Sequence, residues 1–185
     1  NGTLNVTGGV SITGGTYTVS ATGTLGLIGG AQSLSSTQPF YNLNIAGSGN
    51  KTMSTSITVN NQLTLTSNNL VVGSNTLTVG SATGGNGIVV TSGRITTSTT
   101  SSLSFGGSYT NNNLSTIFSN TWPMTIANFT MTRNLCNLGL GSAHNLTVTG
   151  AFTLTAGKFS IGASLLTLNG IATGIGLAIV GLDFG

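Results

Sequence analysis

The chain has 185 residues, of which 38% are hydrophobic and only 3% are charged, with a formal net charge of +3. Soluble domains carry about 25% charged residues on average. The few basic residues lie far apart along the chain, so the composition argues against a nucleic-acid-binding surface. The positive mean hydropathy argues against disorder, which combines low hydrophobicity with high net charge. No stretch approaches the roughly 20 unbroken apolar residues of a membrane-spanning helix, so we expect no membrane span.

Short triplets, in which two apolar residues flank a third residue, recur through the chain with regular spacing. We interpret residues 4–27, 57–79 and 146–168 as three copies of one repeat unit, of which the first is the weakest. The copy at 57–79 contains the triplets Ile57/Val59, Leu63/Leu65, Leu70/Val72 and Leu77/Val79. The copy at 146–168 contains Leu146/Val148, Phe152/Leu154, Phe159/Ile161 and Leu166/Leu168 at identical spacing. The first copy contains Leu4/Val6, Val10/Ile12, Tyr17/Val19 and Leu25/Leu27.

Each triplet has the period of a β-strand, because alternate side chains of a strand point to opposite faces. The middle residue is usually threonine, as at Thr64 and Thr153, which suits a solvated strand face. The links between triplets, such as "NNQ" and "TAGK", contain the asparagine and glycine typical of corners. We therefore predict that Val59, Leu65, Val148 and Leu154 lie in one continuous core and that the threonines point outward.

Strands of about three residues are too short to cross a conventional β-sandwich, but they can line the sides of a coil. With about three strands per coil, one turn takes about 20 residues, and successive coils stack at the ordinary strand spacing of about 4.8 Å. The sequence thus predicts an all-β fold, a right-handed parallel β-solenoid (β-helix), formed as a single elongated domain over residues 1–185. Residues 30–39 and 108–124 lack clear triplets and are expected to be loops or irregular coils.

The segments "YNLNI", "ITVNNQLTLTSNNLVVGSNTLTVG" and "AHNLTVTGAFTLTAGKFSIGASLLTLNG" resemble the β-strand repeats of large secreted surface and adhesin-like proteins of bacteria. The resemblance covers about two thirds of the chain. It implies a parallel β-solenoid, an extracellular or cell-surface location and a structural or adhesive role. The chain departs from the calcium-binding class of such proteins, since it lacks the aspartates of the GGxGxD repeat.

The chemistry of an enzyme is missing from the sequence. Glycoside hydrolysis normally needs two carboxylates, whereas Asp183 is the single acidic residue. His144 and Asp183 could be combined with many serines, but no nucleophile motif surrounds any of them. With one histidine and one cysteine we expect no metal site and no cofactor. We expect His144 to be an exposed corner residue and Cys136 to be a small buried hydrophobic residue.

Three classes of function remain open. The first is a structural or adhesive extracellular module, which the repeats and the low charge favour. The second is a carbohydrate-binding β-helix with a surface glycan as partner, although few aromatic residues besides Tyr109 and Trp122 are available for sugar stacking. The third is an ice-binding solenoid. The T-x-T pairs Thr64/Thr66, Thr76/Thr78 and Thr153/Thr155 do not recur once per coil along the sequence, which argues against the third class.

An open solenoid end is usually blunted by charge, proline or a capping helix. Neither end of the chain has such a cap, and the apolar C-terminal end carries Asp183 as its only charge. The chain starts with Asn1 and carries no signal peptide, so we expect it to be a portion of a longer product. We predict an assembly end at Leu177, Ile179, Val180 and Leu182. This end would pair with adjacent repeats of a longer chain or head to tail with another copy, giving a filament.

The absence of a second acid generates a first prediction. We expect no polysaccharide hydrolase or lyase activity that depends on Asp183 or His144. A reducing-sugar assay on common polysaccharides, comparing the natural chain with its Asp183→Asn variant, checks this. Cleavage that disappears in the variant would show a genuine catalytic site.

Overall fold

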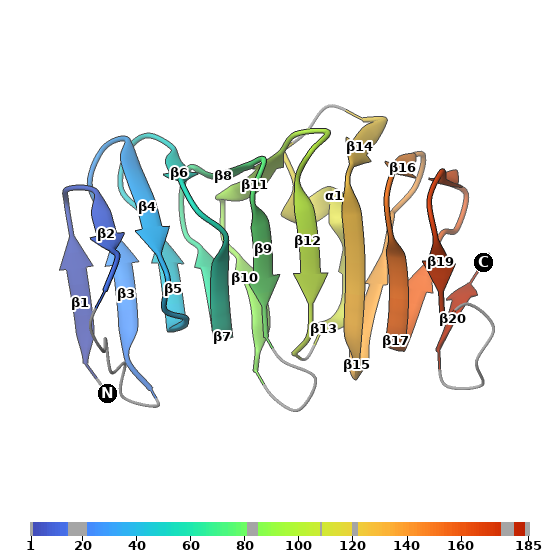
Figure 1. Cartoon of the computed structure of the whole chain (residues 1–185), viewed down its shortest axis with the longest axis horizontal. Coiled ribbons are helices and arrows are strands. Elements are labelled where there is room, and N and C mark those ends of the chain that lie inside the picture. The colour runs from blue at the N-terminus through green and yellow to red at the C-terminus, as the bar shows by residue number, and fades with distance from the viewer. Residues whose placement is uncertain are drawn as a thin grey trace.

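The computed structural model describes residues 2–14, 22–80, 85–107, 109–119, 122–174 and 180–183. These residues form a parallel β-solenoid of about seven turns with almost no helix, as the triplets predict. Figure 1 shows the coils stacked side by side along the longest axis, with β1 at one end and β19 and β20 at the other. Among the described strands every pairing is parallel. The right hand expected for the coil stays a prediction.

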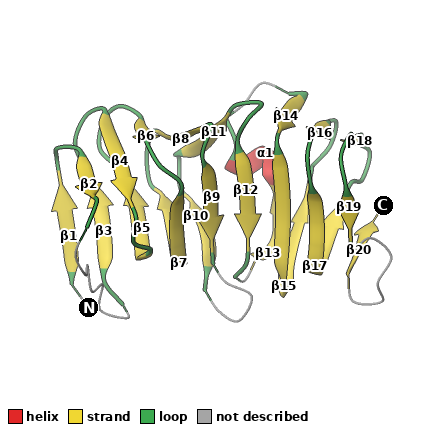
Figure 2. Ribbon diagram, in the orientation of Figure 1, coloured by secondary structure: helices red, strands yellow, loops and turns green. Residues whose placement is uncertain are grey.

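Within the described residues the strands form three sheets, and Figure 2 shows how little of the chain is helical. The 12-stranded sheet contains β1 Thr3–Val6, β3 Thr24–Leu27, β5 Phe40–Ile45, β7 Ile57–Leu65, β9 Thr76–Val79, β10 Gly87–Val90, β12 Ser102–Phe105, β13 Tyr109–Asn113, β15 Asn128–Gly139, β17 Phe152–Ser160, β19 Ala172–Thr173 and β20 Val180–Asp183. The five-stranded sheet contains β2 Val10–Ile12, β4 Gln32–Ser36, β6 Lys51–Met53, β8 Asn69–Gly73 and β11 Arg94–Thr97. The three-stranded sheet contains β14 Met124–Ile126, β16 Leu146–Val148 and β18 Leu166–Leu168, and the short helix is α1 Leu114–Ile117.

The chain visits three faces of the solenoid in a constant order. Face 1 consists of β9, β12 and β19 with the first halves of β7, β15 and β17, and Phe40 at the start of β5 also pairs on this face. Face 2 consists of β1, β3, β5, β10, β13 and β20 with the second halves of the same three strands. Face 3 is made by the five-stranded sheet and then by the three-stranded sheet. Three strand positions per coil therefore match the prediction.

The junction between face 1 and face 2 is not the tight corner that the sequence predicts. In β7 and β17 the strand runs without interruption over nine residues, through "NNQ" and "TAGK". The strand continues because hydrogen bonding between coils does not stop at the bend. The side-chain amide of Asn61, for example, donates to Oδ1 of Asn42 in the preceding coil at 2.7 Å. The expectation of uniformly three-residue strands is therefore wrong at this junction.

The core is one continuous column of inward side chains that runs the length of the solenoid. Val59, Leu65, Val148 and Leu154 are all fully buried, as predicted. Thr64 and Thr153 lie between buried neighbours and are half-buried on the outward side. In the later coils the core is filled by stacked rings, with Phe129 5.5 Å from Phe152 between ring centroids. The alternation of inward apolar and outward polar residues is confirmed.

The three sequence copies begin on three different faces. The first triplet of the copy at 57–79 lies on face 1, in β7. The first triplet of the copy at 146–168 lies on face 3, in β16, and that of the copy at 4–27 lies on face 2, in β1. Because each triplet needs only two inward apolar side chains and one outward polar residue, the same pattern fits any face.

The two segments expected to be loops or irregular coils differ from each other in the structure. Residues 30–39 contain β4, which pairs with β2 and β6 on face 3. Residues 108–124 contain β13 and α1, and Phe118 just after α1 forms a bridge with Ile95 on face 3. The expectation of a loop or irregular coil is wrong for residues 30–39, where serine and glutamine replace the usual apolar triplet but pairing with adjacent coils holds β4 in strand conformation. For residues 108–124 the expected irregular coil is confirmed within the described residues, because the short helix α1 and an isolated bridge stand where a strand of face 3 would be expected.

The alternating burial generates a prediction with an internal control. Leu65→Ala removes a fully buried side chain from the core and should lower the free energy of unfolding by about 2 to 5 kcal/mol. Thr64→Ala, at the neighbouring outward position, should change it by about 0.5 kcal/mol or less. Urea denaturation followed by circular dichroism measures both values. A larger loss from Thr64→Ala than from Leu65→Ala would contradict the register.

Candidate functional site

The acidic and basic groups considered for catalysis do not form a recognisable centre. No group of three or more histidine, cysteine, aspartate or glutamate residues within the described ranges could hold a metal ion. Asp183 ends β20 on face 2, where its register partner is Ser160. His144 precedes β16, on face 3. The two residues thus belong to different faces of the coil.

His144 is not the exposed corner residue that the sequence predicts. Its side chain is only partly exposed, and its ring meets the Trp122 ring edge to face at 4.9 Å between centroids. Its backbone N–H donates to Oγ of Ser164 in the next coil at 3.0 Å. The buried Nδ1 has no hydrogen-bond partner within the described residues. The expectation was wrong because Trp122, which belongs to the preceding coil, packs against His144 at this corner. A contact between coils cannot be predicted from the local sequence pattern.

Lys51 is the one buried charged side chain among the described residues, and it stands at an inward position of β6. Its ammonium donates to the backbone carbonyl oxygens of Gly29 at 3.0 Å, Gly30 at 2.7 Å and Gly49 at 2.8 Å. Burial lowers the pKa of the Lys51 amino group from its usual value. The lysine therefore serves as an internal hydrogen-bond donor for the corner between faces 2 and 3.

Gln32 has the same role in the preceding coil, since it is the register partner of Lys51. Its side-chain amide donates to the carbonyl oxygens of Val6, at 3.0 Å, and Gly8, while its Oε1 accepts from the N–H of Gly29 at 2.9 Å. These buried polar side chains satisfy backbone groups that the tight corners leave without strand partners. Their role is structural, and nothing in the sequence distinguishes Lys51 from the other scattered basic residues.

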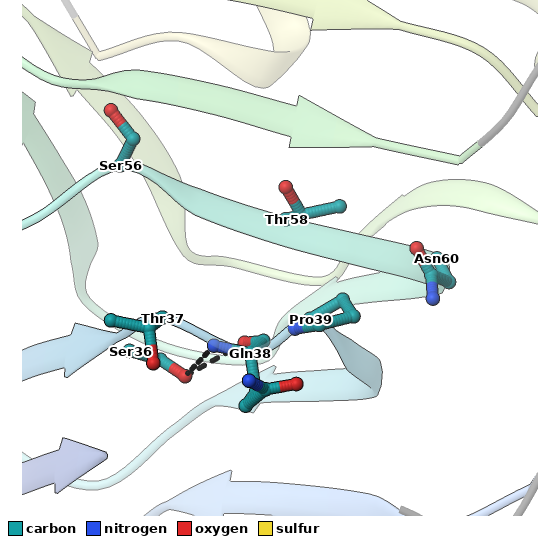
Figure 3. Close-up of a pocket in the computed structure, with 7 residues that line it drawn as sticks. All are labelled: Ser36, Thr37, Gln38, Pro39, Ser56, Thr58 and Asn60. Atoms are coloured by element: carbon teal, nitrogen blue, oxygen red, sulfur yellow. Dashed lines mark hydrogen bonds between the residues drawn. The ribbon is translucent and has the colours of Figure 1, made fainter. Parts of the chain in front are cut away.

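Figure 3 shows a surface hollow of about 210 Å³ where two coils meet. It is lined by Ser36, Thr37, Gln38, Pro39, Ser56, Thr58 and Asn60. Oγ of Ser36 donates to the carbonyl of Gln38 at 2.7 Å and accepts from its N–H at 3.0 Å, so these polar groups are already paired. Typical ligand pockets measure about 300–1,000 Å³ and combine apolar walls with a few polar groups. The hollow is smaller and offers neither charge nor an aromatic ring.

Face 1 carries the most regular outward surface among the described residues. Its middle outward position is occupied in six successive coils by a hydroxyl side chain, and the register joins each to the next. We call this set the hydroxyl column: Thr58, Thr78, Ser104, Thr130, Thr153 and Thr173. The strands that carry it stand side by side in Figure 1. The column is a candidate contact surface because it is periodic and uncharged.

The other faces lack so long a column in the described ranges. On face 2 the register places Asn5, Gly26, Asn44, Thr64 and Val89 in one outward line, in which a hydroxyl occurs once. On face 3 the outward line of the five-stranded sheet contains Ser33, Thr52, Val71 and Thr96, so Val71 interrupts the hydroxyls there. Thr125, Thr147 and Thr167 align over three coils of the last sheet on the same face. Outward hydroxyls therefore occur on face 3 as well, and face 1 differs in having the longest unbroken column among the described residues.

The end coils leave inward positions uncovered. Leu4 is 55% exposed although its register partner Leu25 is buried. Leu166 and Leu168 in β18 are only partly buried. β1 and β2 each pair with one described strand, as do β18, β19 and β20 at the other end. Both end coils thus present strand edges together with apolar side chains.

The predicted assembly end falls only partly within the described structure. Val180 and Leu182 lie in β20, paired with Gly157 and Phe159 of β17, and their side chains are outside the description. Leu177 and Ile179 lie outside the described residues. Cys136 lies in β15, and its side chain is also outside the description, so its predicted burial stays a prediction.

Comparison with protein families, with characterised proteins and with solved structures finds no match to this chain. No helix among the described residues is long and apolar enough to cross a membrane. The function is therefore inferred from the geometry of this chain and from the pattern of its sequence.

The Lys51 contacts generate the next prediction. Lys51→Met keeps most of the buried volume but removes the donor to Gly30 and Gly49, so it should lower the free energy of unfolding by about 2 to 4 kcal/mol. Thr52→Met, at the exposed outward position next to Lys51 in β6, should have a much smaller effect. Chemical denaturation at neutral pH compares the two. Equal stability of both variants would show that the carbonyl contacts of Lys51 contribute nothing.

Proposed function

We propose that this chain is a structural or adhesive module of an extracellular bacterial surface protein or filament, whose end coils pair with further coils. The observation that carries the proposal is the state of the end coils. Within the described residues they combine strand edges that lack a second partner with inward apolar side chains that the next coil would bury, as at Leu4.

Stacking another coil satisfies both needs at once. Every parallel strand added to an edge pairs its free N–H and C=O groups, and every inward side chain added covers the one beside it. Burial of an aliphatic side chain contributes about 1.5 to 3 kcal/mol. Charge and proline are the usual means of blocking edge pairing. The sequences of β1, β2, β18 and β19 contain neither, and Asp183 in β20 is the single charged residue in the described end strands.

Two sources can supply the additional coil. One is an adjacent repeat of a longer chain, and the other is the opposite end of a second copy. Contact between unlike ends does not close on itself and so propagates into a filament. The low charge of the chain supports either arrangement, because little electrostatic repulsion opposes contact between ends.

The extracellular setting rests on the resemblance to bacterial surface repeats and not on the geometry. The proposed structural role, that of a rod, is supported by the continuous core. A rod held by one continuous apolar column can space or display other domains without any catalytic group. Adhesion to a surface glycan is a finer proposal within the same class.

End pairing predicts concentration-dependent self-association of the isolated 185-residue chain. Leu4→Lys places a charge at the inward position of β1 and should reduce association, because that charge would be buried unpaired in the contact. Asn5→Lys adds the same charge at the outward position of the same strand and should leave association nearly unchanged. Sedimentation velocity over a range of concentrations, with negative-stain microscopy, measures the effect.

Two results would count against pairing between copies. The first is a natural chain that stays a monodisperse monomer at every concentration. The second is equal association of Leu4→Lys and Asn5→Lys. Pairing with further repeats is tested by a longer chain in which additional coils are joined to one end of the 185 residues. If this longer chain were no more resistant to denaturant than the 185-residue chain, pairing with further repeats would also be contradicted.

A further inference from the structure

The hydroxyl column of face 1 is uniform in chemistry over six coils. Five of its six members are threonine, and the sixth is Ser104. Threonine is β-branched and therefore has few accessible χ1 rotamers in a strand. Each threonine thus presents one methyl group and one hydroxyl from the same backbone position, with little side-chain freedom.

Most of these hydroxyls are free to bind an external partner. Within the described residues, the hydroxyls of Thr58, Thr78 and Thr130 make no hydrogen bond. The same holds for Ser104. Thr173 donates to Oγ1 of Thr153 at 3.2 Å, at the end of the column. Most hydroxyls of the column therefore face solvent and are not engaged in hydrogen bonds inside the protein.

The backbone beneath the column is held in register. Pairing between β7, β9, β12 and the first half of β15 runs through the column without a register shift. Beside the column, the N–H of Thr76 donates to Oγ of Ser56 at 3.0 Å. The side chain of Asn128 donates to Oγ of Ser102 at 2.9 Å and accepts from the N–H of Ala151 at 2.8 Å. These bonds join neighbouring coils and fix the spacing of the rows.

The spacing of the column follows from the sheet. Neighbouring parallel strands lie about 4.8 Å apart, so six rows span roughly 24 Å. A line of hydroxyls and methyls at this repeat offers hydrogen-bonding groups to water molecules spaced at the same repeat. The repeat is close to that of equivalent oxygen atoms along one axis of the ice lattice, and no charged residue among the face 1 strand residues disturbs the line.

We propose that face 1 is an ice-binding surface and that the hydroxyl column is its contact line. The ligand is the ordered water lattice of an ice crystal. A soluble sugar fits less well, because stacking on a sugar ring needs an exposed aromatic side chain, and the hydroxyl column contains none. This activity is separate from end-to-end stacking, since it uses an outward face and not an end.

The register of the column also revises the sequence-based expectation against an ice-binding face. The T-x-T pairs do not recur once per coil, because Thr64 belongs to face 2 whereas Thr78 and Thr153 belong to face 1. The structure shows that one threonine or serine per coil does recur on a single face. This recurrence cannot be seen in the sequence, because the coils differ in length. The register partners Thr58 and Thr78 are 20 residues apart, whereas Thr78 and Ser104 are 26 residues apart.

The test measures inhibition of ice recrystallisation by the isolated chain in a frozen sucrose solution. The natural chain should keep ice grains small. Thr78→Lys and Thr130→Lys place a long charged side chain in the middle of the column and should abolish the inhibition. Thr64→Lys makes the same change at an outward position of face 2 and should retain it. Thermal unfolding by circular dichroism checks that all variants fold.

The effect on ice growth can be distinguished from an effect on self-association. The lysine variants change only outward positions and leave the inward side chains of the end coils unchanged, so end-to-end pairing should be the same in all of them. A natural chain that does not restrain ice growth would overturn the proposal. So would an equal loss in Thr64→Lys, which would mean that the activity does not depend on face 1. Ice affinity purification of the natural chain, with Thr130→Lys excluded from the ice fraction, would provide independent support.

Discussion

The structure depends on the coupling between two kinds of stacking, backbone pairing and side-chain packing, along the same axis. Each inward side chain is covered by the inward side chain of the next coil because the strands that carry them are paired in register. Neither contribution suffices alone, since a three-residue strand is too short to be stable and the apolar column would be open to water without its neighbours. The end coils, where Leu4 remains exposed, show the effect of one missing neighbour.

This coupling explains why coils of unequal length fit one rod. Pairing joins residues 20 apart between Leu43 and Leu63 but 26 apart between Leu77 and Leu103. Most of the additional residues stand between Val79 and Gly87, that is, between a face 1 strand and the next face 2 strand. Other corners turn sharply at glycines such as Gly47, which has a φ of 78°. A side chain at Gly47 would collide with the carbonyl oxygen of Ile28 in the adjacent coil. The corners therefore absorb variation, while the face strands keep the register on which the hydroxyl column depends.

The sequence predicts where the strands lie and which of their side chains are buried better than it predicts which strands pair with one another. The inward residues Leu65 and Leu154 follow from alternation alone, because period-two patterns report which side of a strand is buried. The face on which a triplet lies depends on how many residues every preceding corner contains, so the alignment of Thr78 with Ser104 could not be read from spacing. The burial of Lys51 and the cover that Trp122 gives His144 also escaped prediction, since each depends on a contact with another coil.

Cross-linking between coils measures the register most directly. In a Cys136→Ala background, Thr78→Cys with Ser104→Cys should form a disulfide readily, because register partners on adjacent strands lie about 4.8 Å apart and disulfides need Cα atoms about 4.4 to 6.8 Å apart. Thr64→Cys with Thr78→Cys is closer in sequence but joins different faces, and it should not form one. Rapid oxidation of the second pair, or none in the first, would contradict the stacked register and with it the hydroxyl column.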